Sequence, residues 1–221
     1  MLARGFSATM PAMDDGNRRA DVTGAILAGG QGRRMGGVNK ALLEVGGEPI
    51  VSRLARTLGA FFEEILVVTR DPAPYEALGL RAVTDRFAQR SSLTGIHAAL
   101  HHAATPFVFV TACDTPLLQP ALVRALLRDL TPDLDVLAPI QENGHYEPLC
   151  AFYSQACLGP VQALLEQDVF QIIRFFPQVR VRAMPVAELR AADPDLLSFA
   201  NANTPEELEQ LRALARRETR P

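Results

Sequence analysis

The segment between Gly24 and Lys40 is the richest part of the chain in residues that could contact a phosphate. It contains six of the fifteen glycines in the 221-residue sequence, and three cationic side chains (Arg33, Arg34 and Lys40) with no acidic one. Glycines let backbone N–H groups approach an anion closely, and Arg and Lys supply the opposite charge. Because the segment follows an apolar run, as a loop follows a buried strand, we interpret it as part of a nucleotide triphosphate site.

The segment matches neither of the two common glycine-rich phosphate motifs. Gly32 and Gly37 have the Walker spacing, but the Lys-Ser/Thr pair that should follow them is missing. A dinucleotide fingerprint that begins at Gly30 would need glycine where Met35 stands. The alternative is a flexible loop with solvated arginines. We favour ligand binding, because loops this rich in glycine after a strand usually bind something.

Apolar periodicity predicts an α/β fold in three layers, with a mostly parallel central sheet between helices on both faces. We expect strands at residues 22–27, 65–69, 80–84, 107–110, 135–139, 149–153 and 180–184, with a short extended segment at 41–45. We expect helices that begin at Pro49, Tyr75, Pro120, Cys157 and Pro205. Residues 91–95 should form a loop and the entry to a further helix, which continues from Ile96 to Ala104. Thr204 and Glu207 have the spacing of a capping box at the start of the last helix.

Asp114 has the residue type and the expected position of a Mg²⁺ ligand. It follows an apolar strand, while the glycine-rich segment and Asp85 follow two other strands. Ligands of parallel α/β sheets bind at the carboxyl ends of the strands, so these three features should converge. Mg²⁺ is commonly held by one or two carboxylates together with substrate phosphates. The alternative for each aspartate is a turn cap at the end of its strand.

Four further residues could contact substrates near that edge of the sheet. We expect Lys40, just beyond the glycine loop, to contact a phosphate, and we assign Arg33 to the phosphates in preference to Arg34. Asn201 and Asn203 precede the last expected helix. Residues two apart in an extended segment share a face, so the asparagines could point together into a cleft or could form only a helix entry.

Two other potentially reactive groups have simpler structural interpretations. His97 and His101 stand four residues apart on an expected helix, but the glutamate of a metalloprotease motif is missing. We interpret this pair as a half-buried helix face. Cys113 has no base near it in the sequence, so we interpret it as a small buried residue and not as a nucleophile.

The composition argues against several classes of function. Apolar residues make up 48% of the chain, enough for a sizeable core. Acidic residues outnumber basic ones by 25 to 22, and the chain has no Trp, so neither the charge nor the aromatic content suits a nucleic-acid binder. No apolar run reaches the ~20 residues that cross a membrane. We therefore expect no nucleic-acid partner and no membrane partner.

The first residues differ in composition from the rest. Residues 1–20 are rich in Gly, Asn, Asp and Arg and lack the apolar core of a signal peptide, so we expect a disordered leader before one domain at 21–216. The three cysteines form no Cys-x-x-Cys pair, which indicates a reducing compartment. We therefore expect the protein in the cytoplasm.

Four segments together resemble the molybdenum cofactor guanylyltransferase family of the nucleotidyltransferase superfamily, and the resemblance covers residues 22–212. The segments are Leu27-Ala28-Gly29-Gly30-x-Gly32-x-Arg34-Met35-Gly36-Gly37-x-x-Lys40, Cys113-Asp114-Thr115-Pro116-Leu117-Leu118, Glu147-Pro148-Leu149 and Asn201-x-Asn203-Thr204-Pro205-Glu206-Glu207-Leu208. The first is typical of the superfamily, and the combination is typical of the molybdenum cofactor branch. The resemblance implies a three-layer, Rossmann-like nucleotidyltransferase fold.

The resemblance also implies a reaction, in which GMP passes from GTP to the molybdenum-bearing molybdopterin cofactor. The products would be molybdopterin guanine dinucleotide and pyrophosphate, with Mg²⁺ as cofactor and molybdoenzyme maturation proteins as a further class of partner. The nucleotide half would span about 21–130 and the second-substrate half about 131–216. Expected contacts are Leu27, Ala28, Gly29, Gly30, Gly32, Thr69 and Asp85 with the nucleotide, Arg33 and Lys40 with its phosphates, Asp114 with GTP and Mg²⁺, and Asn201 and Asn203 with the pterin.

The implied chemistry is mainly positioning. The terminal phosphate of the pterin is already a nucleophile, and it would attack the α-phosphorus of GTP while pyrophosphate leaves in line. The protein must hold the two phosphates together and neutralise the developing charge. Mg²⁺ on Asp114, backbone N–H groups of the glycine loop, Arg33 and Lys40 would supply that charge.

Three positions depart from the family pattern. Asn39 stands where Asp usually precedes the lysine, Thr69 where Asn is common, and Ser92 where Pro is common. Thr69 leaves one nucleotide contact open, while Asn39 and Ser92 could alter the shape of their loops.

Alternative functions remain open within and beyond this superfamily. A cytidylyltransferase for the same pterin would tend to have Leu-Ala-Ala-Gly in place of the sequence from Leu27 to Gly30. The chain is short for a sugar-phosphate nucleotidyltransferase. A non-catalytic carrier that delivers the cofactor to an apo-enzyme belongs to a different class, and the intact Lys40 and Asp114 argue against it.

Overall fold

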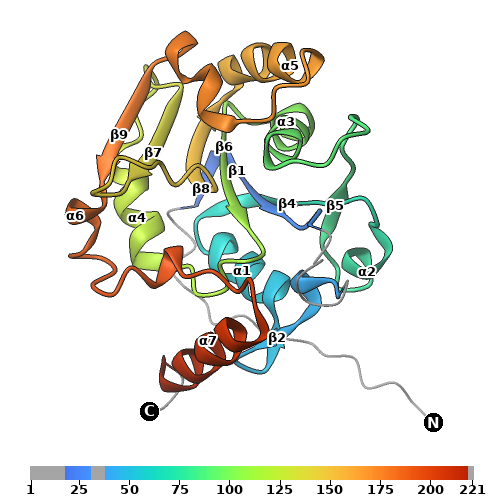
Figure 1. Ribbon diagram of the computed structural model, residues 1–221, viewed down its shortest axis with the longest axis vertical. Coiled ribbons are helices and arrows are strands. Elements are labelled where there is room, and N and C mark those ends of the chain that lie inside the picture. Colours follow the sequence, from blue (N-terminus) through green and yellow to red (C-terminus); the bar gives the residue numbers. More distant parts are fainter. Residues whose placement is uncertain (1–17, 31–37, 219–221) are drawn as a thin grey trace.

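Seven strands form the central sheet of the part of the chain that the structure describes. A computed structural model describes residues 18–30 and 38–218. The strand order is β5-β4-β1-β6-β8-β7-β9 (Figure 1). The strands are β1 (Arg19–Leu27), β4 (Phe62–Val68), β5 (Arg81–Val83), β6 (Phe107–Ala112), β7 (Val136–Ile140), β8 (Cys150–Ser154) and β9 (Val181–Pro185). Because β1 starts at Arg19, the last two residues of the expected leader belong to the strand.

The sheet is mostly parallel, as the sequence predicts. β1 pairs in parallel with β4 on one side and with β6 on the other, and β5 and β9 run parallel to β4 and β7. β8 is antiparallel to both β6 and β7. Leu27 is in register with both Val68 and Ala112, so three strands end at the same level. The loops that follow these strands therefore start side by side.

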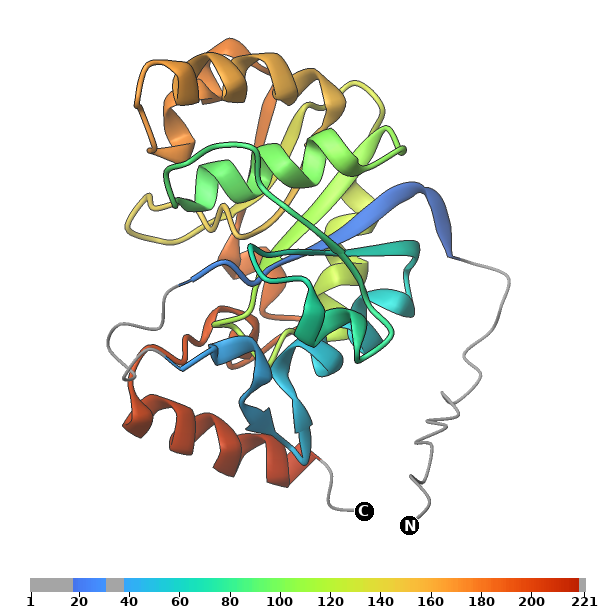
Figure 2. The ribbon, with the colours of Figure 1, turned by 90° about the vertical axis from the view of Figure 1, so that its right-hand side faces the viewer.

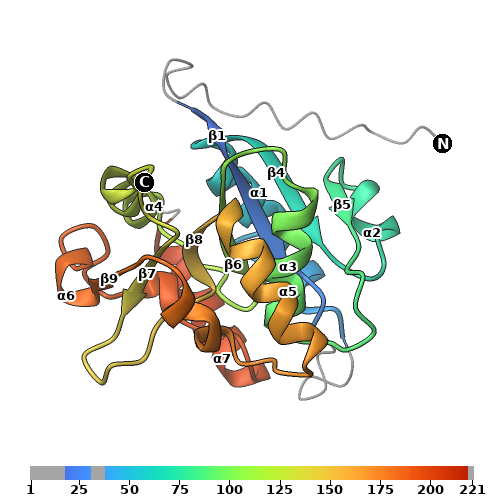
Figure 3. The same ribbon diagram turned by 90° about the horizontal axis from the view of Figure 1, so that it is seen from above.

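Two hydrophobic clusters cover the two faces of the sheet. Along β6, Phe107 and Phe109 belong to one cluster, while Val108 and Val110 belong to the other. This alternation is the period of a strand buried on both faces. The first cluster includes α1 (Ile50–Gly59), α4 (Pro120–Asp129) and α7 (Pro205–Glu218), and the second includes α3 (Ser92–His102) and α5 (Leu158–Glu166). Figure 3 shows α3 and α5 side by side across one face.

Helix α1 shows how the sequence selects its buried side. Ile50, Val51, Leu54 and Leu58 are fully buried, and their spacing places them on one face of the helix. Burying one such side chain contributes about 1.5–3 kcal/mol. The helix begins directly after Pro49, as expected.

A small hairpin connects the glycine-rich segment to α1. Its strands are β2 (Glu44–Val45) and β3 (Glu48–Pro49). The two residues between them are Gly46 and Gly47, with φ values of +67° and +84°, a conformation that glycine adopts without steric cost. Figure 2 shows α7 beside this hairpin, where Arg212 Nε donates to Glu44 O (2.8 Å).

The structure corrects one of the expected elements near the polar edge and defines another more closely. Residues 41–45 were expected to be extended, but only Glu44–Val45 form a strand, and Lys40–Leu42 form a 3₁₀ turn, which Asn39 begins. Helix α3 starts at Ser92, inside the expected helix entry, because Ser91 and Thr94 form a capping box.

Short helical elements complete the described residues. They are α2 (Ala73–Glu76), α6 (Val186–Leu189) and the 3₁₀ turns Gln155–Cys157, Ile172–Gln178 and Leu197–Phe199. Among residues 18–30 and 38–218, none of the helices combines the length and the apolar character that a membrane crossing requires.

Asp135 joins three strands at one edge of the sheet. Its carboxylate accepts hydrogen bonds from the backbone N–H of Arg180 (2.9 Å), from Arg180 Nε (3.0 Å) and from Ser154 Oγ (3.1 Å). The Arg180 hydrogen bond is the main cause that lowers the pKa of Asp135 to about 2. The carboxylate is therefore charged in the folded protein at neutral pH.

Replacing Asp135 by Asn should lower the free energy of unfolding at pH 7 by about 1.5–3 kcal/mol, the usual contribution of a hydrogen bond to a charged group. The pKa of Asp135 falls from 3.8 to about 2 on folding, so its contribution is complete above pH 4 and disappears as the pH falls toward 2. The stability difference between the wild type and D135N, measured by urea unfolding, should therefore shrink over this range. Glu63→Gln, at an exposed position of β4, is the control and should change little at any pH.

Candidate active site

Two cavities adjoin each other at the polar edge of the sheet: the larger opens at the carboxyl ends of β1, β4 and β6, and the smaller lies between the turn after β6 and the start of β8. The larger has a volume of about 550 Å³ and the smaller about 310 Å³. Small-molecule sites commonly measure ~300–1,000 Å³. Ser92, Asp114 and Leu149 line both cavities. Molecules bound in the two cavities would therefore meet at a wall that contains Asp114.

The start of the glycine-rich segment lies at the larger cavity. Leu27, Gly29 and Gly30 line it, and both glycines are exposed. Ala28 is instead part of the hydrophobic core, and its N–H donates to Val68 O (2.8 Å). Residues 31–37 lie outside the described residues. The assignment of Gly32 and Arg33 to the nucleotide therefore stays a prediction, and so does the choice between Arg33 and Arg34.

The N-terminus of α3 also lines the larger cavity. Ser92, Thr94 and Gly95, all in its first turn, contribute to the wall. A helix N-terminus presents unpaired N–H groups and a partial positive charge, both of which attract anions. Gly95 allows close packing here, since a Cβ at this position would lie 2.9 Å from Leu27 Cδ1. Helix α3 and the glycine-rich segment therefore approach each other at the N-terminus of the helix, the end that attracts anions.

Lys40 reaches across the site to the last part of the chain. Its Nζ donates to Ala202 O (2.8 Å) and to Asn203 Oδ1 (3.2 Å). Both Lys40 and Asn203 line the larger cavity. Lys40 is also the only lysine in the sequence. A single ammonium group thus connects the nucleotide side of the site with the segment that was expected to bind the pterin.

Asp114 follows β6, in a turn that is held by hydrogen bonds from Thr115. Thr115 donates to Ala112 O through its backbone N–H (3.2 Å) and through its hydroxyl group (2.9 Å). The carbonyl oxygen of Asp114 accepts from the backbone N–H of Ala202 (2.7 Å). Thr115 therefore supplies the capping hydrogen bonds of the turn, which favours a role for the Asp114 carboxylate beyond turn capping.

Burial and charge act on Asp114 in opposite directions. Removal from water raises the pKa of Asp114, and the nearby charge of Lys40 partly opposes this rise. A partly buried carboxylate next to an ammonium group suits a site that must hold a polyphosphate and a cation together. The neighbouring Cys113 is buried, and burial raises the pKa of its thiol to about 12. This agrees with the interpretation of Cys113 as a small buried residue.

The two asparagines near the end of the chain line different cavities. Asn203 lines the larger cavity and Asn201 the smaller one. Between them, the buried Ala202 is held by Asp114 and Lys40. Thr204 and Glu207 form the expected capping box, with Glu207 N donating to Thr204 Oγ1 (3.2 Å) and Thr204 N donating to Glu207 Oε2 (3.1 Å). The segment is therefore fixed by α7 on one side and by Asp114 and Lys40 on the other.

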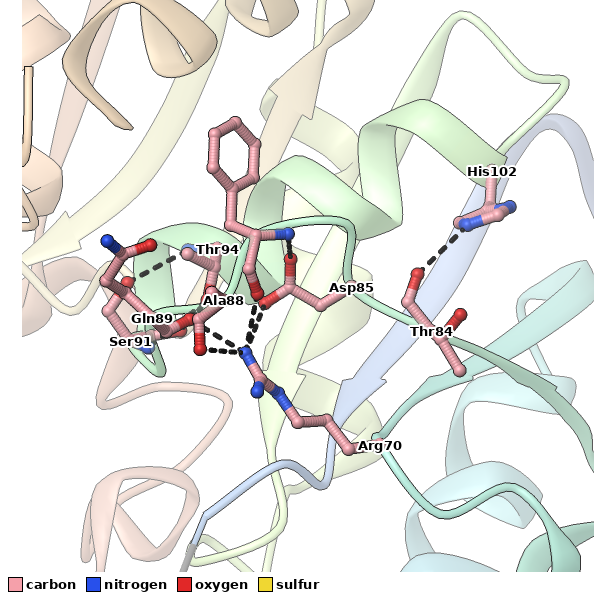
Figure 4. A network of polar contacts seen from close by, with 9 residues as sticks. Arg70, Thr84, Asp85, Ala88, Gln89, Ser91, Thr94 and His102 are labelled. Atoms are coloured by element: carbon pink, nitrogen blue, oxygen red, sulfur yellow. Dashed lines mark hydrogen bonds and ion pairs between the residues drawn. The ribbon is translucent and has the colours of Figure 1, made fainter. Parts of the chain in front are cut away.

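Asp85 lines the larger cavity and also organises the loop from which it projects. Its Oδ1 accepts from the backbone N–H of Phe87 (2.8 Å), and its Oδ2 lies 3.9 Å from Arg70 Nη2 (Figure 4). Arg70 Nη2 donates to three carbonyl oxygens of the same loop, those of Phe87 (2.6 Å), Ala88 (2.9 Å) and Gln89 (2.9 Å). The pair therefore shapes the chain that leads into Ser91 and α3.

Thr69 and Asn39 are two of the departures from the family pattern. Both lie next to the buried side chain of Tyr75. Thr69 is buried and lines the larger cavity, and its hydroxyl accepts from Asp71 N (3.3 Å). Asn39 contacts the hydroxyl of Tyr75. Ser92, the third departure, lies in the wall that the two cavities share.

Neither histidine of the pair on α3 is among the residues that line the two cavities. The rings of His97 and His101 stack with centroids 6.0 Å apart. His97 is buried, and burial is the main cause that lowers its pKa. Within residues 18–30 and 38–218, no cluster of three or more His, Cys, Asp or Glu side chains could hold a metal ion. His97 is buried and His101 is exposed, so the pair lies on a half-buried helix face.

Sequence reasoning missed several residues of the site. Arg70 and Arg90 line the larger cavity, but neither was expected there. Arg70 directly follows Thr69 at a strand end, a position that could have identified it. Arg90 directly precedes the capping residue Ser91, and a helix start recognised at Ser91 would have placed it at the site. Ala202 makes its contacts through backbone atoms, so no side-chain pattern reveals it.

The comparison with known families agrees with this geometry. The model of the MobA-like NTP transferase domain matches residues 24–181, more than half of the chain. The chain belongs to this family. Membership confirms the expected resemblance and makes the protein an enzyme of a nucleotidyltransferase family with a Rossmann-like fold.

Individual relatives extend the similarity over nearly the whole chain. The molybdenum cofactor guanylyltransferase of Desulfosudis oleivorans is 42% identical over 194 residues, covering 87% of this chain and 95% of that protein. The probable molybdenum cofactor guanylyltransferase of Pelotomaculum thermopropionicum is 39% identical over 193 residues, covering 87% and 93%. Among solved structures, molybdopterin-guanine dinucleotide biosynthesis protein A of Archaeoglobus fulgidus has a TM-score of 0.77 and 28% identity, covering 88% of this chain and 99% of that one.

Replacing Arg70 by Ala should weaken the binding of a nucleoside triphosphate about tenfold, because the loop after β5 would lose the charged donor that contacts three of its carbonyls, and a hydrogen bond from a charged group contributes ~1.5–3 kcal/mol. Titration with a fluorescent nucleoside triphosphate measures the affinity, and hydrogen exchange should show faster exchange over residues 85–91. Arg128→Ala, at an exposed position of α4, is the matched control. Unchanged affinity and exchange in R70A would mean that the loop keeps its shape without Arg70.

Proposed function

We propose that this MobA-like enzyme transfers GMP from GTP to the terminal phosphate of the molybdenum-molybdopterin cofactor, forming molybdopterin guanine dinucleotide and pyrophosphate. The observation that carries the proposal is the pair of cavities that share Asp114, because a transfer between two phosphates requires two binding sites with a common wall. The relatives named as molybdenum cofactor guanylyltransferases support the choice of substrates.

The larger cavity suits the triphosphate of GTP. The N-terminus of α3 and the ammonium group of Lys40 offer positive charge, and Gly29 and Gly30 bring exposed backbone to the wall. These groups would orient the α-phosphorus toward the shared wall and stabilise charge on the leaving pyrophosphate. The pterin phosphate needs no strong base, so the chemistry depends on this positioning.

The smaller cavity suits the pterin substrate. Its polar lining includes Asn201, Thr115 and Glu147. Gln141 Nε2 donates to Glu147 Oε1 (2.8 Å), which fixes the orientation of this carboxylate. Amide, hydroxyl and carboxylate groups can together match the donors and acceptors of a pterin ring. The second substrate would thus approach Asp114 from the side opposite the triphosphate.

The Asp114 carboxylate fits a Mg²⁺ ion that is shared with substrate phosphates. Since the described residues contain no larger cluster of metal-binding side chains, the protein can offer only a few ligands, as is usual for Mg²⁺ on nucleotides. When bound, the ion would neutralise charge on the reacting phosphates. Asp114 would hold it at the shared wall, while Lys40 limits the repulsion between the carboxylate and the phosphates.

Replacing Asp114 by Ala should lower turnover at least ~100-fold, the usual effect of removing one electrostatic stabiliser of a transition state. Asp114→Asn keeps the shape but not the charge, and it should lose nearly as much. Pyrophosphate release in the presence of GTP, Mg²⁺ and the pterin cofactor measures turnover. Asp195→Asn, at an exposed position, is the control. Near-normal turnover in D114A would rule out the metal-binding role.

A panel of GTP, CTP and ATP tests the choice of nucleotide. We expect pyrophosphate release with GTP in the presence of the pterin cofactor, and at least ~10-fold less with CTP, because the two bases present different hydrogen-bonding edges. Release with CTP but not with GTP would instead indicate the cytidylyltransferase. Binding of GTP and cofactor without any pyrophosphate release would indicate the carrier.

A further inference from the structure

Tyr75 is a fully buried tyrosine beneath the turn that carries Lys40. It lies on α2, and its hydroxyl is 3.0 Å from Asn39 Nδ2 and 3.2 Å from Asn39 Oδ1. A primary amide has both a donor and an acceptor, and so has a phenol, so the two groups can satisfy each other. The contact joins parts of the chain that are 36 residues apart in sequence.

Asn39 transmits this contact to the backbone next to Lys40. It is the N-terminal cap of the 3₁₀ turn Lys40–Leu42, and its Oδ1 accepts from Ala41 N (3.2 Å). Its carbonyl oxygen accepts from Leu42 N (3.1 Å). The orientation of Asn39 therefore fixes the start of the turn, and with it the direction in which Lys40 leaves the backbone.

The turn needs such an external anchor. It is only three residues long, and short 3₁₀ turns have poor hydrogen-bond geometry and little stability of their own. Its one buried residue is Ala41, whose side chain is too small to fix the orientation of the turn by packing. Lys40 itself must place Nζ within hydrogen-bond distance of Ala202 O through a long and flexible side chain. An error in the backbone direction would be magnified at Nζ.

We propose that Tyr75 is a positioning residue of this enzyme, and that it sets the place of the Lys40 ammonium group through Asn39. The kinetic part of the inference rests on the proposed function, in which Lys40 contacts the phosphates of GTP. The structural part does not depend on the proposed function, because the chain of contacts from Tyr75 to Lys40 is a property of the fold.

The protonation state of Tyr75 supports this role. Burial is the main cause that raises the pKa of Tyr75, while hydrogen bonding to Asn39 and Thr69 partly opposes the rise. The phenol therefore stays neutral at physiological pH and keeps its proton for Asn39. Thr69 lines the larger cavity, so the hydroxyl of Tyr75 sits between the Lys40 turn and the end of β4.

The single lysine of the sequence makes the structural part directly measurable. A protein labelled with ¹³C,¹⁵N-lysine gives side-chain NMR signals from Lys40 alone. We expect Tyr75→Phe to shift these signals toward the values of a free lysine side chain. Tyr153→Phe is the matched control, because Tyr153 is also fully buried and donates a hydrogen bond, to Pro148 O (2.6 Å). It should leave the Lys40 signals in place.

Kinetics separate positioning from a general loss of stability. In Y75F we expect the KM for GTP to rise about tenfold while the KM for the pterin cofactor changes less than about twofold, because Lys40 lines the larger cavity and is not among the residues that line the smaller one. A merely structural role would lower the melting temperature and the concentration of active enzyme without this selective effect on GTP. Equal changes in both KM values would overturn the proposal.

Variants at Asn39 test the same contact from its other end and avoid a change in the core. In N39D, the carboxylate can accept from both Tyr75 and Ala41, so this variant should keep the Lys40 signals and the KM for GTP close to wild type. In N39L neither contact can form, and the variant should behave like Y75F. Loss of GTP affinity in N39D with full affinity in N39L would contradict the proposed chain of contacts.

The outcomes distinguish the two proposals. If the wild type releases no pyrophosphate from GTP but Y75F and N39L still displace the Lys40 signals, the proposed reaction fails and the positioning role stands. If the wild type is active and neither the Lys40 signals nor the KM for GTP changes in Y75F, the positioning role fails and the proposed reaction stands.

Discussion

The backbone of Ala202 makes the two hydrogen bonds on which the geometry of the site depends. Its N–H donates to Asp114 O (2.7 Å) and its carbonyl accepts from Lys40 Nζ (2.8 Å). Leaving either buried group without a partner would cost about 1–3 kcal/mol. The two contacts hold the carboxyl end of β6, the turn after the glycine-rich segment and the last segment before α7 in one arrangement. Asp114, which lines both cavities, belongs to this arrangement.

The fold and the convergence of the main residues follow from simple properties of the sequence. Apolar runs such as Phe107 to Val110 can be buried on both faces, which requires helices on both sides of the sheet. Parallel strands place their carboxyl ends at one edge, so the loops after β1, β4, β5 and β6 had to meet. Asp114, Asp85 and the start of the glycine-rich segment could therefore be assigned to one site from the sequence.

The remaining features depend on contacts between distant residues, which no local pattern encodes. Tyr75 approaches Asn39 only when α2 folds against the Lys40 turn, and that turn is a 3₁₀ turn although its sequence resembles a strand. Arg70 donates to backbone carbonyls of the loop after β5, and backbone atoms are the same for every residue type. The helix entry at residues 91–95 was expected, and its exact start could also have been predicted, since Ser91 and Thr94 have the spacing of a capping box.

The contact between Lys40 and Ala202 also has a consequence for the order in which the protein folds. It joins residues separated by 162 positions in the sequence, and contacts of such separation form late because a long loop must close first. A growing chain on the ribosome presents Gly29, Lys40 and Asp114 well before Ala202 has been synthesised. The ammonium group gains its acceptors Ala202 O and Asn203 Oδ1 only once the segment before α7 has docked. We therefore expect the site to be completed late in folding.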